Sequence, residues 1–280
     1  MEQMELHKQN APLCKVLALE TTGQIASAAL AIKQDDAAAY RFAERHSRET
    51  FNHLTELFPI LQHLLSAEGL KLSDLDAIAV SAGPGSFTGM RIGVSAARAI
   101  AQATGVPLIK VPTLETFVFS DAYQYGFVAC PVFDARRGQI YAGAYRLVQG
   151  GHEGLGIEAE DASVSASTET LETLVPGGAY DPADFFEQLT ARGIRIEDDA
   201  QFFGDETACG TFCGTARDGS SLSPRSRHLV FPMLSQTAIS VAKWALTFGT
   251  PADYRNVFPI YMRKAEAQRK LDENLLKPLG

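Results

Sequence analysis

The chain has 280 residues, of which 46% are hydrophobic, so it is long enough to bury a substantial core. Its 25 basic residues are outnumbered by 33 acidic ones, and the formal net charge is -8 at pH 7. This balance argues against a chain that binds nucleic acid by itself, because phosphate binding depends on clustered Lys and Arg.

The sequence carries no sign of export or of membrane insertion. The first twelve residues include charged side chains and lack an apolar core, which argues against a signal peptide. No apolar run approaches the length that spans a bilayer. We therefore expect a cytoplasmic protein without membrane contact.

The cysteines and histidines predict no metal site. Cys209 and Cys213 have one residue too many between them for a C-x-x-C pair, and no second pair is present. His46, His53 and His63 do not have the H-x-x-x-H spacing that brings two imidazoles to one metal on a helix. We expect reduced thiols and no bound metal.

The first half of the chain has the pattern of a strand meander followed by alternating strands and helices. Apolar runs between turn signals predict the strands, and apolar residues three and four apart predict the helices. In chain order, the predicted elements are strands at 16–19, 25–32 and 37–43, a helix at 51–65, a strand at 75–80, a helix at 89–104, a strand at 107–111 and a helix that begins at residue 113.

The second half repeats this order more loosely. The predicted elements are strands near 127–133, 139–147 and 201–204 and helices near 182–192 and 235–248. Two polar stretches, 149–178 and 214–227, show no sustained period and are predicted to be exposed loops or insertions.

The loop at 81–93, S-A-G-P-G-S-F-T-G-M-R-I-G, carries the strongest functional signal. It follows a predicted strand and opens a helix, a place where free backbone N–H groups can bind a phosphate. The candidate residues are Gly83, Gly85, Ser86 and Thr88. The loop has neither the lysine of a Walker sequence nor the spacing of G-x-G-x-x-G. The alternative is a tight corner in which Ser86 or Thr88 caps the helix.

The first two predicted helices suit a helical partner. Gly89, Gly93, Ala97 and Ala101 recur every four residues, so another helix can pack there at the short end of the roughly 8 to 10 Å range. The apolar stripe of the preceding helix is wider than one core face requires. Its members in the predicted interface are Phe51, Leu54, Leu57, Phe58 and Leu61. The alternative is that the small face packs on the chain's own sheet and that the first helix is buried on two sides.

Several segments resemble the motifs of one family. The glycine-rich loop resembles G-P-G-S-F-T-G-x-R-I-G, and L-A-L-E-T-T at 17–22 resembles L-A-I-D-T-S. R-H-S at 45–47 resembles R-x-H-S, P-V-F-D-A-R-R-G-Q-I-Y at 131–141 resembles P-V-I-D-A-R-R-G-E-V-Y, and P-I-Y-M-R at 259–263 resembles P-V-Y-L-R. These are motifs of the TsaB (YeaZ) family of tRNA threonylcarbamoyladenosine biosynthesis proteins, which are also known as M22 glycopeptidase homologues. The resemblance is strong from about 16 to 145 and returns at the C-terminus.

The resemblance implies the two-lobed α/β fold shared by actin, Hsp70 and the sugar and acetate kinases, the ASKHA fold. Two ribonuclease H-like lobes then face each other across a nucleotide cleft, in agreement with the predicted order of elements. The expected first lobe is 1–115, with 258–280 packing back on it. The second lobe is 116–257, with insertions near 149–178 and 214–227.

The resemblance also implies residues of the cleft. In active members of this fold the first hairpin carries a carboxylate that organises magnesium near the phosphates, and Glu20 stands at that position, one methylene longer than the family's aspartate. Glu20 and Thr21 are therefore candidates for a nucleotide or phosphate site, and the alternative is that they satisfy backbone donors in the turn. Asp134 and Arg136, at the end of a later strand, are further candidates. One alternative is that these two side chains bind phosphate, and the other is that they form a surface ion pair that holds the next hairpin in place.

For function, the resemblance implies a non-catalytic scaffold. TsaB proteins pair with TsaD, which forms N6-threonylcarbamoyladenosine (t6A) at position 37 of tRNAs that read ANN codons, and with themselves when TsaD is missing. The ATPase TsaE joins the pair, and tRNA is reached only through the complex. The chain requires no cofactor of its own, and ATP or ADP with Mg²⁺ is expected only at the interface with TsaD.

Two other functions remain open at this stage. One is a self-sufficient ATPase or kinase of the same fold, and the other is an M22-type glycopeptidase. The chain lacks a clear adenosine loop for the first, and for the second it lacks a metal-binding histidine pair and an assignable Ser, His and Asp set. We therefore expect no catalytic activity from the chain alone.

Overall fold

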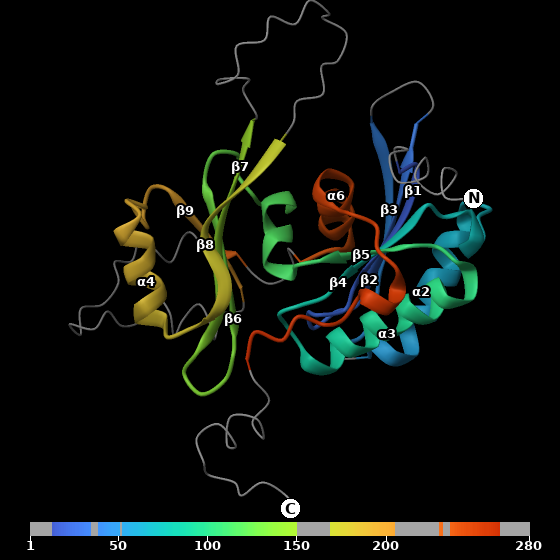
Figure 1. Cartoon of the computed structure of the whole chain (residues 1–280), viewed down its shortest axis with the longest axis horizontal. Helices are drawn as coiled ribbons and strands as arrows, with labels where there is room; N and C mark the ends of the chain where they lie inside the picture. The colour runs from blue at the N-terminus through green and yellow to red at the C-terminus, as the bar shows by residue number, and fades with distance from the viewer. Residues whose placement is uncertain are drawn as a thin grey trace, which may run out of the picture.

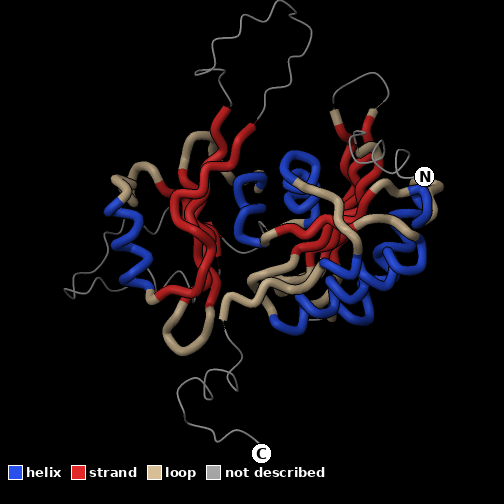
Figure 2. The backbone as a smooth tube through the Cα atoms, in the orientation of Figure 1, coloured by secondary structure: helices blue, strands red, loops and turns tan. Residues whose placement is uncertain are grey.

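The computed structural model describes residues 13–34, 39–50, 52–149, 169–204, 230–231 and 236–263. Their strands form two five-stranded sheets that stand side by side, with helices between the sheets and on the outer faces (Figures 1 and 2). None of the helices in these ranges has the length and apolar character needed to cross a bilayer.

The first sheet has the strand order β3-β2-β1-β4-β5. Its strands are β1 (Lys15–Glu20), β2 (Ser27–Lys33), β3 (Tyr40–His46), β4 (Ala77–Ser81) and β5 (Leu108–Val111). β1, β2 and β3 pair antiparallel, and β4 pairs parallel with both β1 and β5. The connections to β4 and β5 run through α2 (His53–Ala67), the short η1 (Leu72–Asp74) and α3 (Phe87–Thr104). Parallel neighbours require such crossovers, which cover one face of the sheet.

The second sheet repeats the topology of the first. Its order, β8-β7-β6-β9-β10, again has an antiparallel meander followed by two parallel strands. Its strands are β6 (Val128–Asp134), β7 (Ile140–Gln149), β8 (Glu169–Tyr180), β9 (Ala200–Gly204) and β10 (Val230–Phe231). Helix α4 (Pro182–Ala191) covers its outer face (Figure 1). The chain therefore contains the same five-strand unit twice, and β1 and β6 are equivalent.

Two helical segments fill the space between the sheets (Figure 1). Helix α6 (Ala238–Phe248) packs its buried residues on the first sheet. The 3₁₀ segment η2 (Thr113–Phe119) packs on the second, where the ring of Phe117 lies 5.7 Å from that of Phe133 and 5.4 Å from that of Phe203. The space between the two sheets is therefore filled by α6, which packs on the first sheet, and by η2, which packs on the second.

The predicted elements are present within a few residues of their expected ends, with two differences. The helix expected to begin at residue 113 is a 3₁₀ segment. Residues 169–178, predicted as loop, belong to β8, so that prediction is wrong for this part of 149–178. β8 is an edge strand with most of its side chains partly or fully exposed, and it therefore lacks the apolar alternation that identifies a half-buried strand. The second polar stretch, 214–227, lies outside the described residues, as does 264–280.

The small face of α3 is buried inside the chain itself. Ala97 and Ala101 are 0% and 2% exposed. A Cβ atom added at Gly89 would overlap the carbonyl oxygen of Thr21, and one added at Gly93 would overlap the hydroxyl of Thr21. The prediction that this face docks a partner helix is therefore wrong. The close approach suggested by the four-residue spacing is an approach of the chain to its own first hairpin.

The wide apolar stripe of α2 divides into two faces. Leu57 and Leu61 are buried in the core of the first lobe, so the predicted partner contact is wrong for them. Leu54 is 71% exposed and Phe58 is 53% exposed, and both point away from that core. Phe51 lies outside the described residues. Only the outer part of the predicted α2 surface is accessible.

Ala97→Trp should destabilise the isolated chain, because an indole at a fully buried position has no space to occupy. We expect a loss of about 1 to 3 kcal/mol or more in the free energy of unfolding. Ala99→Trp, at an exposed position on the same helix, is the matched control and should change it by less than about 0.5 kcal/mol. Urea unfolding of both variants measures the difference, and an unchanged midpoint for Ala97→Trp would contradict the packing.

Candidate functional site

The glycine-rich loop between β4 and α3 is held by the turn that follows β1. The N–H of Ser86 donates to the carbonyl oxygen of Thr22 at 2.8 Å, and the hydroxyl of Thr21 donates to the carbonyl oxygen of Gly89 at 2.8 Å. A Cβ atom at Gly85 would lie 2.6 Å from the carbonyl oxygen of Thr22. Glycine is required here because the two backbones nearly touch.

Three of the loop's amide groups are already engaged within the chain. Besides the Ser86 amide, the N–H of Gly83 donates to the hydroxyl of Thr113 at 3.0 Å, and the N–H of Gly89 donates to the hydroxyl of Ser86 at 3.2 Å. Ser86 is therefore the helix cap, as the alternative interpretation of the loop predicted. The side chain of Thr88 is exposed and does not close the loop. These three amide groups do not point at an open anion site.

The segment before the end of the described chain covers the loop. After the 3₁₀ turn η5 (Tyr254–Asn256), the N–H of Ile260 donates to the carbonyl oxygen of Ala82 at 2.7 Å. Gly83 has a φ of 114°, which favours glycine, and a Cβ atom there would also meet the carbonyl oxygen of Ile260 at 3.0 Å. Further along, the guanidinium of Arg263 donates to the carbonyl oxygen of Ala135 in the second lobe. This segment therefore contacts both lobes.

Glu20 is fully buried, and its carboxyl group points toward the turn that follows β1. Its Oε1 accepts hydrogen bonds from the N–H of Thr22 at 2.5 Å and from the hydroxyl of Thr22 at 2.7 Å. The amide of Gln236 donates to the same hydroxyl. Among the described residues, Oε2 of Glu20 and Oε1 of Gln236 have no hydrogen-bond partner. Burial raises the pKa of the Glu20 carboxyl, and the nearby hydroxyl of Ser81 opposes the rise.

This arrangement does not fit a magnesium ligand. Oε1 of Glu20 is committed to Thr22, and the whole carboxyl group is fully buried, whereas a magnesium ion keeps several waters and binds carboxylates that are open to them. The described part of the chain also contains no group of three or more His, Cys, Asp or Glu side chains that would hold a metal. The structure therefore supports the alternative role of Glu20, in which it satisfies donors of its own turn.

Asp134 and Arg136 form a local ion pair at the equivalent end of β6. Oδ1 of Asp134 accepts from the N–H of Arg136 at 2.7 Å, and Oδ2 lies 3.4 Å from its guanidinium. The Arg136 side chain is 87% exposed, so the pair contributes little to stability. Among the described residues, no hydrogen bond joins either side chain to the glycine-rich loop. The structure thus shows the hairpin-fixing pair and does not bring all the predicted cleft residues together.

The sequence pattern did not reveal the groups that close this site. Thr113, Gln236 and Ile260 reach it from distant parts of the chain, and none carries a local signal for that role. The only sign was the family-like P-I-Y-M-R segment, which includes Ile260. No periodicity could have placed Gln236 beside Thr22, because 214 residues separate them.

Glu20→Gln should remove a pH dependence from stability. Because burial raises the pKa of Glu20 above its unfolded value of about 4.5, the folded chain binds this proton more tightly than the unfolded chain does. The free energy of unfolding should therefore fall as the pH rises from about 4.5 through the folded pKa, and Glu20→Gln should flatten this fall. Urea unfolding between pH 4.5 and 8 tests it, with the exposed Glu187→Gln as control. Parallel profiles for wild type and Glu20→Gln would contradict the prediction.

Comparison with known proteins gives relatives over most of the chain. The family model described as TsaD, tRNA N6-adenosine threonylcarbamoyltransferase, matches residues 47–269. The tRNA threonylcarbamoyladenosine biosynthesis protein TsaB of Bacillus subtilis (strain 168) is 30% identical over 234 residues, which cover 80% of this chain and 85% of the relative. The protein of the same name from Escherichia coli (strain K12) is 26% identical over 259 residues, or 92% of this chain and 98% of the relative.

A solved structure shows the same fold. The crystal structure of a Pseudomonas aeruginosa protein described as similar to the peptidase YEAZ has a TM-score of 0.63. The two sequences are 22% identical, and the superposition covers 90% of this chain and 100% of the Pseudomonas chain. Together with the two repeated sheets, this fold is the two-lobed, actin-like one. With the identity shared over most of its length, the chain belongs to the TsaB (YeaZ) family.

Proposed function

We propose that this protein is a scaffold subunit in the formation of N6-threonylcarbamoyladenosine in tRNA, and that it pairs with a TsaD protein through the outer face of α2 and α3. The names of its relatives support the pathway. The family model that matches the chain is that of TsaD, a tRNA N6-adenosine threonylcarbamoyltransferase. A TsaD protein is therefore the partner that we propose. The surface of the first lobe carries the more specific part of the proposal.

The single observation behind it is where large apolar side chains are exposed. Of the six exposed large hydrophobic residues in the described part of the chain, five lie on α2, on α3 or on the tail beside α3. They are Leu54, Phe58, Phe87, Phe258 and Tyr261. Scattered apolar residues are normal on a surface, but a concentration on two adjacent helices marks an interaction site (Figure 1).

Arginines order this surface. The guanidinium of Arg91 lies 4.1 Å from the ring centre of Phe87 and donates to the hydroxyl of Tyr261 at 3.1 Å. Arg98 lies 4.8 Å from the ring centre of Phe258. Aromatic residues and arginine dominate the binding energy of protein interfaces, and side chains already held in place lose little entropy on binding. The α2–α3 surface is therefore prepared for a protein partner.

The internal hydrogen bonds at the glycine-rich loop support a scaffold rather than an enzyme. Thr22 and Ile260 each make a backbone hydrogen bond to the loop, and Oε1 of Glu20 is committed to its turn. In our proposal, catalysis comes from the TsaD partner, and ATP or ADP with Mg²⁺ binds only where that partner completes the site. The chain forms a homodimer through the same face when TsaD is absent. TsaE joins the assembled pair, and tRNA meets this chain only through the complex.

The isolated chain should therefore not turn over ATP. We expect a rate far below about 1 per second, the lower end of ordinary enzymatic rates, and no modification of tRNA. Modification should appear when the chain is mixed with TsaD, TsaE and the enzyme that supplies the threonylcarbamoyl adenylate. Phosphate release and nucleoside analysis of tRNA measure the two activities. Ordinary ATP turnover by the chain alone would point to the kinase alternative.

Replacing both Leu54 and Phe58 by Ser should weaken TsaD binding without unfolding the chain. Both side chains are exposed, so the melting temperature should stay close to that of the wild type. In the proposed complex both side chains become buried against TsaD, so losing these two anchors should raise the Kd of the complex at least about thirtyfold. Tyr125→Ser is the matched control, because Tyr125 is 52% exposed but lies in the second lobe. Titration calorimetry with TsaD measures the Kd, and equal weakening by the control would refute the assigned surface.

A further inference from the structure

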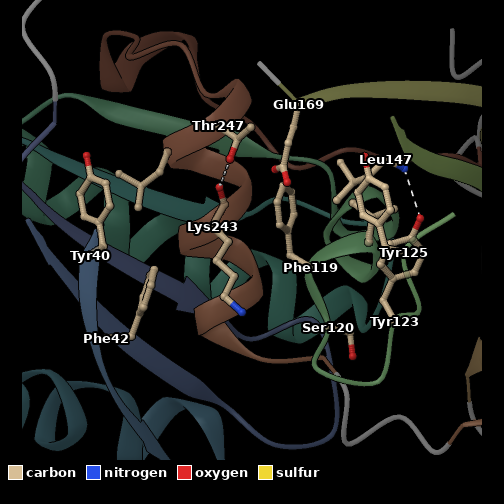
Figure 3. Close-up of a pocket in the computed structure, with 12 residues that line it drawn as sticks. Tyr40, Phe42, Phe119, Ser120, Tyr123, Tyr125, Leu147, Glu169, Lys243 and Thr247 are labelled. Carbon is tan, nitrogen blue, oxygen red and sulfur yellow. Dashed lines mark hydrogen bonds between the residues drawn. The ribbon is translucent and has the colours of Figure 1, made fainter. Parts of the chain in front are cut away.

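A groove lies on the chain well away from α2, α3 and the glycine-rich loop. It runs between β3 and α6 of the first lobe and the segment that leads from η2 into β6, with the ends of β7 and β8 on its far side (Figure 3). Its volume is about 520 Å³, which is within the range of about 300 to 1,000 Å³ typical of small-molecule sites. The groove is open to solvent, and neither the α2–α3 surface nor the predicted cleft contributes to it.

Aromatic rings from both lobes line this groove. Tyr40 and Phe42 come from β3, and their ring centres lie 6.5 Å apart. Phe119 comes from η2, and its ring is held 5.8 Å from that of Phe248. Tyr125 lines the groove on the side of the second lobe and is 52% exposed (Figure 3). The first three rings are only partly buried by the chain, so part of each ring is open to an apolar ligand.

Lys243 supplies a positive charge among these rings. Figure 3 shows its side chain extending from α6 between Phe42 and Phe119. The ammonium group lies 3.4 Å from the carboxylate of Asp121, whose side chain is 96% exposed. An ion pair so open to water is weak, so an anionic group of a ligand can replace Asp121. The chemistry of the groove is therefore apolar and aromatic with one cation.

The neighbouring charge limits the ligand. Glu169, at the start of β8, adds a carboxylate to the lining of the groove (Figure 3), and the whole chain has a net charge of -8. A nucleic acid strand or another polyanion would meet repulsion there, because one lysine cannot neutralise several phosphates. A single negative charge on a small molecule can be placed at Lys243 and away from Glu169.

We propose that this groove binds a small planar aromatic molecule that carries one negative charge. The rings of Tyr40, Phe42, Phe119 and Tyr125 hold its flat part, and the ammonium group of Lys243 holds its anionic group. This site is separate from the proposed TsaD surface and does not depend on it.

A matched pair of fluorescent probes tests this proposal on the full chain. One is 1-anilinonaphthalene-8-sulfonate, and the other is N-phenyl-1-naphthylamine, which has the same rings without the charge. The wild type should bind the sulfonate more tightly. Lys243→Met should weaken sulfonate binding about fivefold, the value of a partly exposed ion pair, and leave the uncharged probe within about twofold. Tyr125→Ala should weaken both probes.

Two controls separate this groove from other apolar surfaces. Lys110→Met removes an exposed lysine from β5 and should change neither affinity. The Leu54 and Phe58 double Ser variant should likewise leave the charge preference intact. The proposal is overturned if Lys243→Met leaves sulfonate binding unchanged or weakens both probes equally. Loss of probe binding as the protein concentration rises would assign the groove to a second copy of the chain and would also overturn it.

Discussion

The close approach of the first hairpin to α3 is the constraint on which the rest of the first lobe depends. The turn carrying Thr21 and Thr22 lies directly on the loop and on the first two turns of the helix. It can do so because Gly85, Gly89 and Gly93 have no side chains at the points of contact. Any Cβ atom there would force the hairpin away from the helix, and the strand that ends at this turn is central to the sheet.

This packing decides which polar groups of the turn and of the glycine-rich loop are used inside the chain. It turns Glu20 toward Thr22, where the carboxyl is buried, and it uses the loop's amide groups for internal hydrogen bonds. The N–H of Ile260 then donates to the carbonyl oxygen of Ala82, and the guanidinium of Arg263 donates to that of Ala135 in the second lobe. The large apolar side chains that remain exposed face outward, mostly on α2, on α3 and on the tail beside α3.

The repeated topology makes the difference between the lobes visible. Glu20 and Asp134 end equivalent strands, β1 and β6, of two sheets with the same strand order. Glu20 is fully buried and bonded to the next turn, and burial raises the pKa of its carboxyl group. Asp134 ends in an open hairpin and pairs with Arg136 in solvent. The equivalent strand end is therefore buried in the first lobe and exposed in the second.

The sequence by itself determined the α/β class, the order of the elements and the family, because apolar periodicity and local motifs are properties of neighbouring residues. It also predicted that two backbones approach at the small face of α3. It could not say which backbones, since the same spacing serves an internal contact and a partner contact equally well. It likewise missed β8, an edge strand whose residues are held by pairing with β7 and not by a buried face of their own. Only the tertiary structure placed Thr21 on Gly93 and Gln236 beside Thr22, because such contacts join segments far apart in the chain and depend on how the whole core packs.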